Sequence, residues 1–360
     1  MTIFKRDEII VLLGAGASVE AKIPASLGMI NKIEELLKNN WSDYKKLYDY
    51  VKSAINYSDG IKGSFSGNNY NVERLVNTLD DLRKGDNHPL YPFIGAWNPK
   101  LSEVAGQDLR KISGFRTEIV TILRDDWVQL TYNNDANYFK GLINFQRQYQ
   151  HPLRVFTLNY DLCVEVHSSE VKLERGFNNE RIWDWRRFDD TTEDAKDLYL
   201  YKLHGSVDWT KDDHDNLIYK ENSSEIPPDD VAIIFGTTYK LQYVDPFLFF
   251  AYEFRKWTLD SAKIIIAIGY GFGDEHINGI LSQALNNNVE RKLLSISPIR
   301  NDVTEKKKES SIKDILNIRK DDQIVCWGYG AKEFMTNKMD IKELSNLFPS
   351  DNALIPEVSS

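Results

Sequence analysis

The sequence predicts an α/β protein in which a doubly wound parallel sheet carries an inserted helical subdomain. Short apolar runs alternate with helical patterns over the second half of the chain, which is typical of strands joined by crossover helices. The residues from Ile9 to Leu13 form the first apolar run, and such a continuous run is typical of a strand buried on both faces. A glycine turn follows it directly. These observations predict a Rossmann-like arrangement, in which ligands bind beyond the carboxyl ends of the strands.

Composition restricts the class of protein further. The chain has 360 residues, of which 42% are hydrophobic, so it can bury one large core, and its net charge of -9 argues against nucleic acid as the main ligand. The two cysteines, Cys163 and Cys326, lie far apart, so we expect neither a disulfide framework nor a zinc ribbon. We find no leader and no apolar run of about 20 residues, and we expect a cytoplasmic protein without a membrane anchor.

The glycine turn GAGAS, residues 14–18, is predicted to bind a pyrophosphate. Gly14 and Gly16 let the backbone turn sharply and approach a ligand, and Ser18 adds a hydroxyl donor beside the N–H groups of the following turn. The match to G-x-G-x-x-G is incomplete because Val19 stands at the third glycine position, and no GK[ST] follows. A tight strand-to-helix turn without a ligand is the alternative interpretation.

Helical patterns dominate the next part of the chain. Residues 27–38 carry apolar side chains at helical spacing, with Ser26 as the expected N-cap. Further helices are predicted over residues 44–55, 72–82, 109–130 and 138–149. This stretch is longer than a simple crossover, so we interpret residues 41–150 as a helical insert, with residues 58–69 as a solvated linker.

Strand patterns return after the insert. They cover residues 153–158, 198–203, 231–235, 263–268, 292–296 and 323–327, with helices expected over 245–259 and 274–285. Residues 1–40 and 151–340 are therefore predicted to form the Rossmann-like domain, followed by a tail over 341–360. The polar run KDDHDN around His214 is interpreted as a solvated hairpin tip rather than a metal cluster.

Three of the predicted strands end in unusual polar residues. The sequences are TLNYD with Asn159 and Asp161, KLHGS with His204, and GYGFGD from Gly269 to Asp274. Because the carboxyl ends of parallel strands lie at one edge of a sheet, we expect all three to face the same crevice.

The motifs GAGAS, NYD, LHG and GYGFGD, in this order, resemble the sirtuin-like (silent information regulator) NAD-binding fold. The chain looks like a sirtuin-like NADase of bacterial antiphage defence, and a subunit paired with a HerA-type ATPase is one form that this resemblance admits. It covers residues 9–24 and 153–298. Deacetylating sirtuins have a Phe-Arg run after Ile-Pro, a glutamine before the asparagine and a zinc ribbon. Here Ala25 follows Pro24 and Leu158 precedes the asparagine, which disfavours deacylation.

The resemblance assigns candidate roles to the motif residues. Asn159 orients a water or a ribose hydroxyl, and His204 takes a proton, because cleavage of the nicotinamide bond builds positive charge on the ribose. The alternatives are a turn or cap residue for Asn159, a structural histidine for His204 and a helix cap for Asp274. The expected NAD-binding residues are Gly14, Ala15, Gly16, Ser18, Pro24, Asp161, Gly269, Tyr270, Gly271, Asp274 and Ser297.

The expected function is hydrolysis of NAD, as substrate, to nicotinamide and ADP-ribose, with no metal required. A protein deacylase and a non-catalytic subunit that binds NAD or ADP-ribose are the alternatives. Little chain follows Trp327, less than the roughly 100 residues of an independent sensor domain, so we expect a separate sensor or HerA-type ATPase partner. Trp97 and Trp127 make the insert rich in apolar residues, and we expect exposed apolar surface there and a homo-oligomer.

Overall fold

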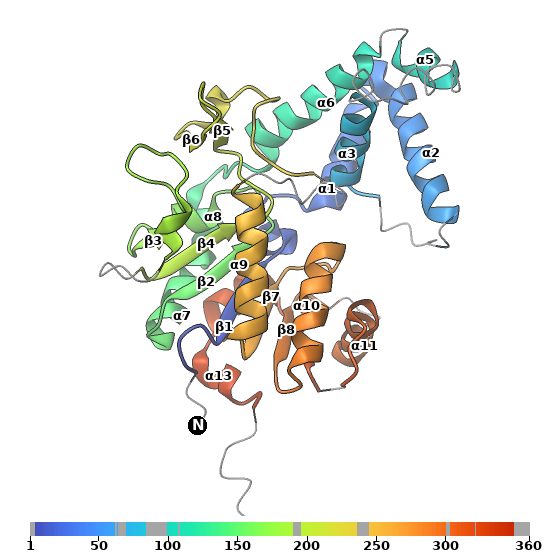
Figure 1. Cartoon of the computed structure of the whole chain (residues 1–360). Helices are drawn as coiled ribbons and strands as arrows, with labels where there is room; N and C mark the ends of the chain where they lie inside the picture. The colour runs from blue at the N-terminus through green and yellow to red at the C-terminus, as the bar shows by residue number, and fades with distance from the viewer. Residues whose placement is uncertain are drawn as a thin grey trace, which may run out of the picture.

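A seven-stranded, wholly parallel sheet forms the centre of the computed structural model (Figure 1). The structure describes residues 4–61, 63, 70–83, 99–106, 109–189, 196–235, 245–299, 303–320 and 322–348. The strand order is β3-β4-β2-β1-β7-β8-β9. The strands are β1 (Ile9–Leu13), β2 (Leu153–Thr157), β3 (Leu173–Glu174), β4 (Leu198–Lys202), β7 (Ile264–Ile268), β8 (Lys292–Ile296) and β9 (Ile324–Trp327). The predicted Rossmann-like α/β fold is confirmed.

The strand order reverses direction between β1 and β7. From β1 the chain adds β2 and then β4 on one side, whereas β7, β8 and β9 are added on the other. In open α/β sheets the crevice beyond such a switch point is where ligands bind. The residues that follow β1, β2, β4 and β7 are therefore the ones to examine.

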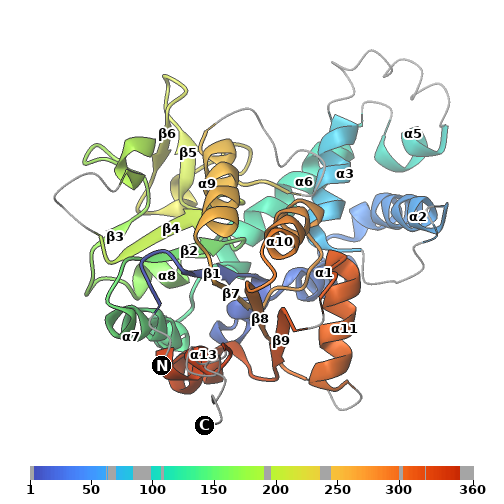
Figure 2. The same cartoon turned by 60° about the horizontal axis from the view of Figure 1, so that its bottom comes forward.

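Alternate residues of each strand enter two different cores. In β1, Ile9, Val11 and Leu13 pack on one face, while Ile10 and Leu12 pack on the other. The second face is covered by α9 (Phe247–Asp260), α10 (Glu275–Asn287) and α11 (Glu305–Leu316). Figure 2 shows these helices on the side of the sheet opposite α7 (Lys140–Tyr149) and α13 (Ile341–Ser345). Both faces are buried, which explains why β1 and β7 are continuous apolar runs.

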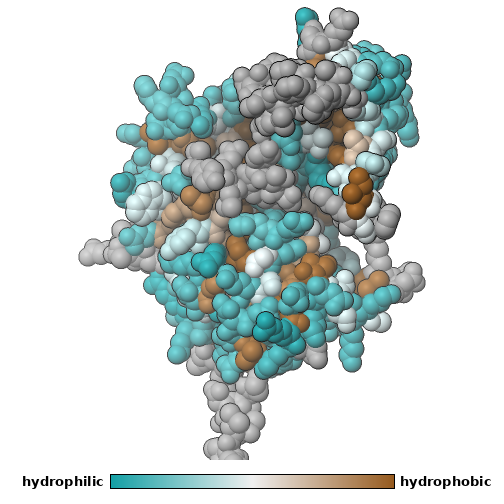
Figure 3. Space-filling model, turned by 45° about the vertical axis from the view of Figure 1, so that its right-hand side comes forward, coloured by the Kyte–Doolittle hydropathy of each residue, from teal (hydrophilic) through white to brown (hydrophobic). Residues whose placement is uncertain are grey.

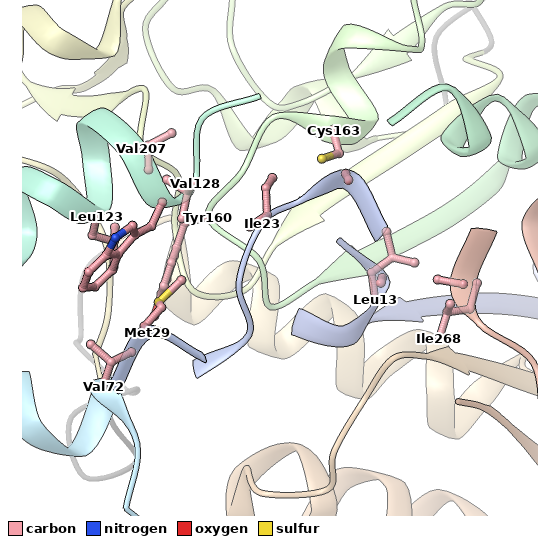
Figure 4. Close-up of a cluster of buried hydrophobic side chains, with 14 of the residues drawn as sticks. Leu13, Ile23, Met29, Val72, Leu123, Val128, Tyr160, Cys163, Val207 and Ile268 are labelled. Atoms are coloured by element: carbon pink, nitrogen blue, oxygen red, sulfur yellow. The ribbon is translucent and has the colours of Figure 1, made fainter. Parts of the chain in front are cut away.

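The helical insert shares the first core with the sheet. Helix α1 (Ser26–Leu36) precedes the insert. The insert includes α2 (Lys45–Ile61), α3 (Val72–Arg83), α5 (Pro99–Ala105) and α6 (Arg110–Ile122), followed by a π-helical turn (Leu123–Trp127). Figure 4 shows Met29, Val72 and Leu123 of this region beside Val128 and Tyr160. Apolar residues of α3 and α6 belong to the same buried cluster as Val11 of β1. The insert is thus packed on the domain rather than attached by a linker.

Three local predictions are wrong. Ser26 is the first residue of α1, and Ala25 precedes it as an N-cap without a side-chain hydrogen bond. Residues 58–61 are the last turn of α2 rather than a linker, and 62 and 64–69 lie outside the described residues. Residues 231–235 form no strand. Ala232 and Ile234 donate backbone hydrogen bonds to the Trp209 and His204 carbonyls, and Ile233 forms an isolated bridge with Gly205 rather than part of a ladder.

The KDDHDN run is the tip of a hairpin, as predicted. Strands β5 (Trp209–Lys211) and β6 (Leu217–Tyr219) pair antiparallel, and Asp212 accepts backbone hydrogen bonds from His214 and Asn216 across the turn. Within the described ranges, no group of three or more His, Cys, Asp or Glu residues is arranged to hold a metal ion.

Exposed apolar surface is scattered over the part of the molecule shown in Figure 3. Trp127 is only 2% exposed and belongs to the first core, so it does not contribute to the exposed apolar surface that was expected on the insert. Trp97 lies outside the described residues. The exposed apolar side chains of the insert are Tyr57, Ile61 and Tyr132. No helix in the described segments is both long and apolar enough to span a membrane.

Candidate functional site

The loops after β1 and β7 meet at the switch point through their backbones. The N–H of Gly14 donates to the Ile268 carbonyl and that of Gly16 donates to the Gly269 carbonyl, both at 2.9 Å. A Cβ on Gly14 would lie 2.6 Å from the Tyr270 Cα. Gly269 has φ +64°, and a Cβ there would lie 2.1 Å from the Ala17 nitrogen. These three glycines are required for one loop to pack on the other, whatever further contact they make with a ligand.

The glycine turn does not lead directly into an α-helix, and α1 begins close to the start that the sequence predicted. Two short 3-10 turns (Ala15–Ala17 and Val19–Ala21) follow β1, and α1 begins only at Ser26. The N–H groups of Ala17 and Ser18 donate to the carbonyls of Gly14 and Ala15. The N–H groups of Gly14 and Gly16 also donate to backbone carbonyls, so four N–H groups of this turn already have a hydrogen-bond acceptor within the protein. Phosphate binding by the turn stays a prediction.

Asn159 follows β2, and its amide is held in one orientation. Its Nδ2 donates to the Gly14 carbonyl at 3.1 Å and to the Ser18 hydroxyl at 3.0 Å. Because a carbonyl only accepts, the nitrogen must face Gly14. The Oδ1 atom is then buried without a hydrogen-bond partner among the described residues. It is an oriented acceptor at the edge where the sheet meets its ligand.

Asp161 and Ser18 support this orientation. The Ser18 hydroxyl donates to Asp161 Oδ2 at 2.8 Å, and Asp161 Oδ1 accepts from the Cys163 N–H at 3.0 Å. The Ser18 hydroxyl therefore donates to Asp161 and accepts from the Asn159 amide. Asp161 therefore helps to hold Asn159 in place through Ser18, and its predicted contact with NAD is untested. Ser18 is placed as a positioning residue, and its predicted contact with phosphate is untested.

His204 follows β4 at the same level as Asn159 follows β2. The register pairs Thr157 with Lys202, so both side chains come two residues after paired strand positions. His204 Nε2 lies 3.1 Å from Asp274 Oδ2, and its Nδ1 is buried without a hydrogen-bond partner in the described structure. The next residue, Gly205, has φ +86°, and a Cβ there would lie 2.1 Å from the Ala232 carbonyl oxygen. Only glycine allows this loop to pack so closely.

The two oxygens of the Asp274 carboxylate have different roles. Oδ1 accepts from the N–H groups of His276 and Ile277 and so caps α10, which is one of the two roles predicted for this residue. Its Oδ2 faces His204, a contact that the sequence analysis missed. The two residues are 70 positions apart, and no local pattern connects them.

The rest of the GYGFGD motif is partly structural. The Tyr270 hydroxyl donates to the Asn278 side chain at 2.8 Å, and burial raises the pKa of this phenol well above its ordinary value, with Asp274 adding to the effect. A Cβ on Gly271 would meet nothing within 4 Å, so this glycine faces open space. Ser297 follows β8, and its Oγ is buried without a partner in the described residues. Binding of adenosine by Gly271 and Ser297 stays a prediction.

A small cavity lies beside Asn159. It holds about 30 Å³, the space of roughly one water molecule. Its lining comprises Ala15, Ser18, Ile23, Pro24, Ser26, Met29, Val72, Glu73, Val128, Leu158, Asn159, Tyr160 and Asp161. Val72 and Glu73 belong to the first turn of α3, so the insert contributes directly to the site. The sequence analysis assigned no functional residue to the insert, and no motif marks Glu73.

A network of buried charges lies behind the site. Lys202, the last residue of β4, donates to the Asp161 carbonyl at 2.5 Å and to Glu165 at 3.0 Å. The Arg175 guanidinium donates to Asp208 at 2.6 Å. Burial by itself would raise the pKa of Asp208, but the Arg175 and Lys202 cations hold it below its ordinary value. The network ties the loops that carry Asn159 and His204 to each other.

The fold and the site define a Rossmann-like α/β protein with an oriented amide and an imidazole–carboxylate pair at its switch-point edge. Residues 153–319 match the family model described as the SIR2-like domain, which supports a sirtuin-like family and an NAD-related activity. The matched region begins at β2 and includes Asn159, His204 and Asp274. The comparison with curated proteins finds no match.

Proposed function

We propose that the protein hydrolyses NAD to nicotinamide and ADP-ribose. The observation that carries this proposal is the Asn159 amide, whose Oδ1 is left as an oriented acceptor by the bonds of Nδ2 to Gly14 and Ser18. It lies in a region that matches the SIR2-like domain, and His204 is its counterpart after the next strand. An uncharged amide holds a water or a ribose hydroxyl without adding charge.

The reaction needs few groups. The bond between the ribose C1′ and the nicotinamide nitrogen breaks, and its electron pair returns to the pyridine ring, so that nicotinamide leaves neutral. A water oxygen bonds to C1′ and loses one proton. In this proposal His204 receives that proton, and Asp274 stabilises the resulting imidazolium through Nε2. Asn159 Oδ1 accepts from the attacking water or from a ribose hydroxyl and so orients it.

The experiment is an assay of nicotinamide released from NAD by the purified chain. We expect Asn159→Ala and His204→Ala each to lower turnover by about 100-fold to 10,000-fold, because each removes a positioned group. His214→Ala at the exposed hairpin tip is the matched control and should keep wild-type turnover. Folded Asn159→Ala and His204→Ala variants with undiminished turnover would show that the chemistry takes place elsewhere.

The two alternative functions are separated in the same assay. A deacylase requires an acyl-lysine peptide for nicotinamide release, whereas a hydrolase does not. A non-catalytic subunit binds NAD without releasing nicotinamide. The resemblance of the four motifs to hydrolytic sirtuin-like proteins also supports three broader proposals. The first is that NAD depletion serves antiphage defence, and the second is that the chain forms a homo-oligomer. The third is that a separate sensor, such as a HerA-type ATPase, controls the activity of the chain.

A further inference from the structure

The first turn of α3 brings Glu73 from the insert into the cavity beside Asn159. Asn71 accepts from the Arg74 N–H at 2.9 Å through its side chain, which fixes the start of the helix at Val72. Arg74 then holds Asp59 of α2 through two hydrogen bonds, at 2.6 and 2.8 Å. The position of Glu73 is therefore set by a cap and by an ion pair between two helices.

The cavity is apolar apart from its carboxylates and Asn159, Ser18, Ser26 and the Tyr160 hydroxyl. Its described lining contains two ionisable carboxyl groups, Glu73 and Asp161, and no Lys, Arg or His. Asp161 accepts from the Ser18 hydroxyl and the Cys163 N–H, so it belongs to the support of Asn159. Glu73 comes from α3 of the insert.

A second observation places the Glu73 carboxylate near the reacting groups. Burial raises the pKa of Tyr160 well above its ordinary value, and Glu73 and Asp274 add to that effect. The same two carboxylates also contribute to the raised pKa of Tyr270, whose largest cause is again burial. Glu73 is therefore close enough to act electrostatically on residues from the loops after β2 and β7. Tyr160 in turn lies beside His204, with ring centroids 6.4 Å apart.

We propose that Glu73 is a specificity-determining residue that selects the cationic nicotinamide ring of NAD and stabilises the positive charge that develops on the ribose. Stabilisation of the charge on the ribose rests on the proposed function, whereas selection of the nicotinamide ring does not. NAD carries a positive charge on the nicotinamide nitrogen, whereas NADH is neutral there. A carboxylate in the wall of the cavity attracts the cationic ring more strongly than the neutral one, because only the cationic ring carries the opposite charge. During cleavage the charge moves to the ribose, which the same carboxylate stabilises.

The test compares wild type with Glu73→Gln, which keeps the size of the side chain and removes its charge. Three ligands are used: carba-NAD, NADH and ADP-ribose. Carba-NAD is a cationic analogue whose ribose ring oxygen is replaced by carbon, so that it is not cleaved. We expect wild type to bind carba-NAD at least about tenfold more tightly than NADH, and Glu73→Gln to lose most of this preference. ADP-ribose lacks the nicotinamide, so its affinity should change less than about twofold. Turnover of NAD should fall at least about tenfold.

Two variants control for charge and shape. Glu118→Gln removes one negative charge from an exposed position of α6 in the same insert and should leave all readouts at wild-type values. Glu73→Asp keeps the charge and should retain the preference for carba-NAD.

The outcomes separate this inference from the proposed function. Unchanged ligand preference in Glu73→Gln would overturn the inference even if wild type hydrolyses NAD. An equal loss of carba-NAD and ADP-ribose affinity would overturn it too, since the effect would not concern nicotinamide. A wild type that prefers carba-NAD through Glu73 but releases no nicotinamide would refute hydrolysis and retain the selectivity. Failure of wild type to bind any of the three ligands would overturn both.

Discussion

At the scale of single residues, Asp274 connects the start of a helix with the candidate site. One carboxylate oxygen caps α10, and the other lies 3.1 Å from His204 Nε2. The two roles differ in their need for charge. A cap requires only an acceptor, and asparagine supplies one as well as aspartate does. Stabilisation of a protonated imidazole requires the anion.

Asp274→Asn should therefore separate the two roles. We expect the free energy of unfolding to change by less than about 1 kcal/mol, because Asn also caps helices. We expect NAD turnover to fall by at least about 10-fold, because the imidazolium loses its counter-charge. Denaturant unfolding and the nicotinamide assay measure the two quantities. A variant that loses stability without losing turnover would show that the cap is the only role of Asp274.

Two glycines of one motif offer a second contrast at this scale. A Cβ at Gly269 would meet the Ala17 nitrogen at 2.1 Å, and its φ of +64° is unfavourable for other residues, whereas a Cβ at Gly271 would meet nothing within 4 Å. We expect Gly269→Ala to destabilise the protein by at least about 2 kcal/mol and Gly271→Ala by less than about 0.5 kcal/mol. Thermal unfolding of both variants is the measurement. Equal effects would contradict the packing of the β1 loop on the β7 loop.

At the scale of elements, the buried charges behind the site join the ends of β2 and β4. Lys202 ends β4 and bonds to the loop after β2, while Arg175, just after β3, pairs with Asp208 in the loop after β4. Buried charges are destabilising unless they are paired, so removal of one partner leaves the other exposed to the full desolvation cost. The elements that carry Asn159 and His204 are thus coupled by electrostatics as well as by the sheet.

Asp208→Asn tests this coupling through its pH dependence. The folded-state pKa of Asp208 lies below the ordinary 3.8, so its ionisation stabilises the fold above that pH and the stabilisation disappears as the pH falls through the folded value. We expect the variant to be less stable than wild type by about 3 kcal/mol at pH 7. The difference should shrink as the pH falls below about 3.8 toward the folded-state pKa. Urea unfolding across this range measures it, and a difference independent of pH would refute the charge-based explanation.

At the scale of the whole molecule, the insert closes the site. The cavity of about 30 Å³ is far below the roughly 300 Å³ or more of a ligand pocket, and Val72, Glu73 and Val128 of the insert form part of its wall. Because the insert shares its core with one face of the sheet, it moves as packed helices rather than as a free linker. Entry of a nicotinamide ring therefore requires α3 to shift relative to β2.

Amide hydrogen exchange should detect this shift. With carba-NAD bound, we expect altered exchange in the first turn of α3 and around Val128, and unchanged exchange in α11 on the other face of the sheet. The bound ligand opens the cavity and then contacts these residues. Saturation with carba-NAD that leaves α3 unchanged would contradict entry through this cavity.

Much of the fold follows from local pattern. Five-residue apolar runs identify β1 and β7, because these strands are buried on both faces and are apolar at every position. The equally buried β2 also contains Arg154 and Thr157. Parallel strands end at one edge, so Asn159 and His204 could be placed together before their contacts were known. Residues 231–235 show the limit of this reasoning. They are equally apolar, but Ile234 donates to His204 in the loop after β4 and Ala232 donates to Trp209 of β5, and only the tertiary structure determines these partners.

The sequence by itself determined the α/β class, most strands of the sheet and the polar strand ends, and it gave the cap of α10 as one of two alternatives for Asp274, since each depends on residues that are near one another in the chain. Only the tertiary structure decided the partners across elements. His204 faces Asp274 from another strand, Asn159 is held by Gly14 from β1's loop, and Glu73 reaches the cavity from the insert. These contacts depend on how helices and strands pack over long sequence separations, and side-chain periodicity reports which face of an element is buried but not which residue it meets.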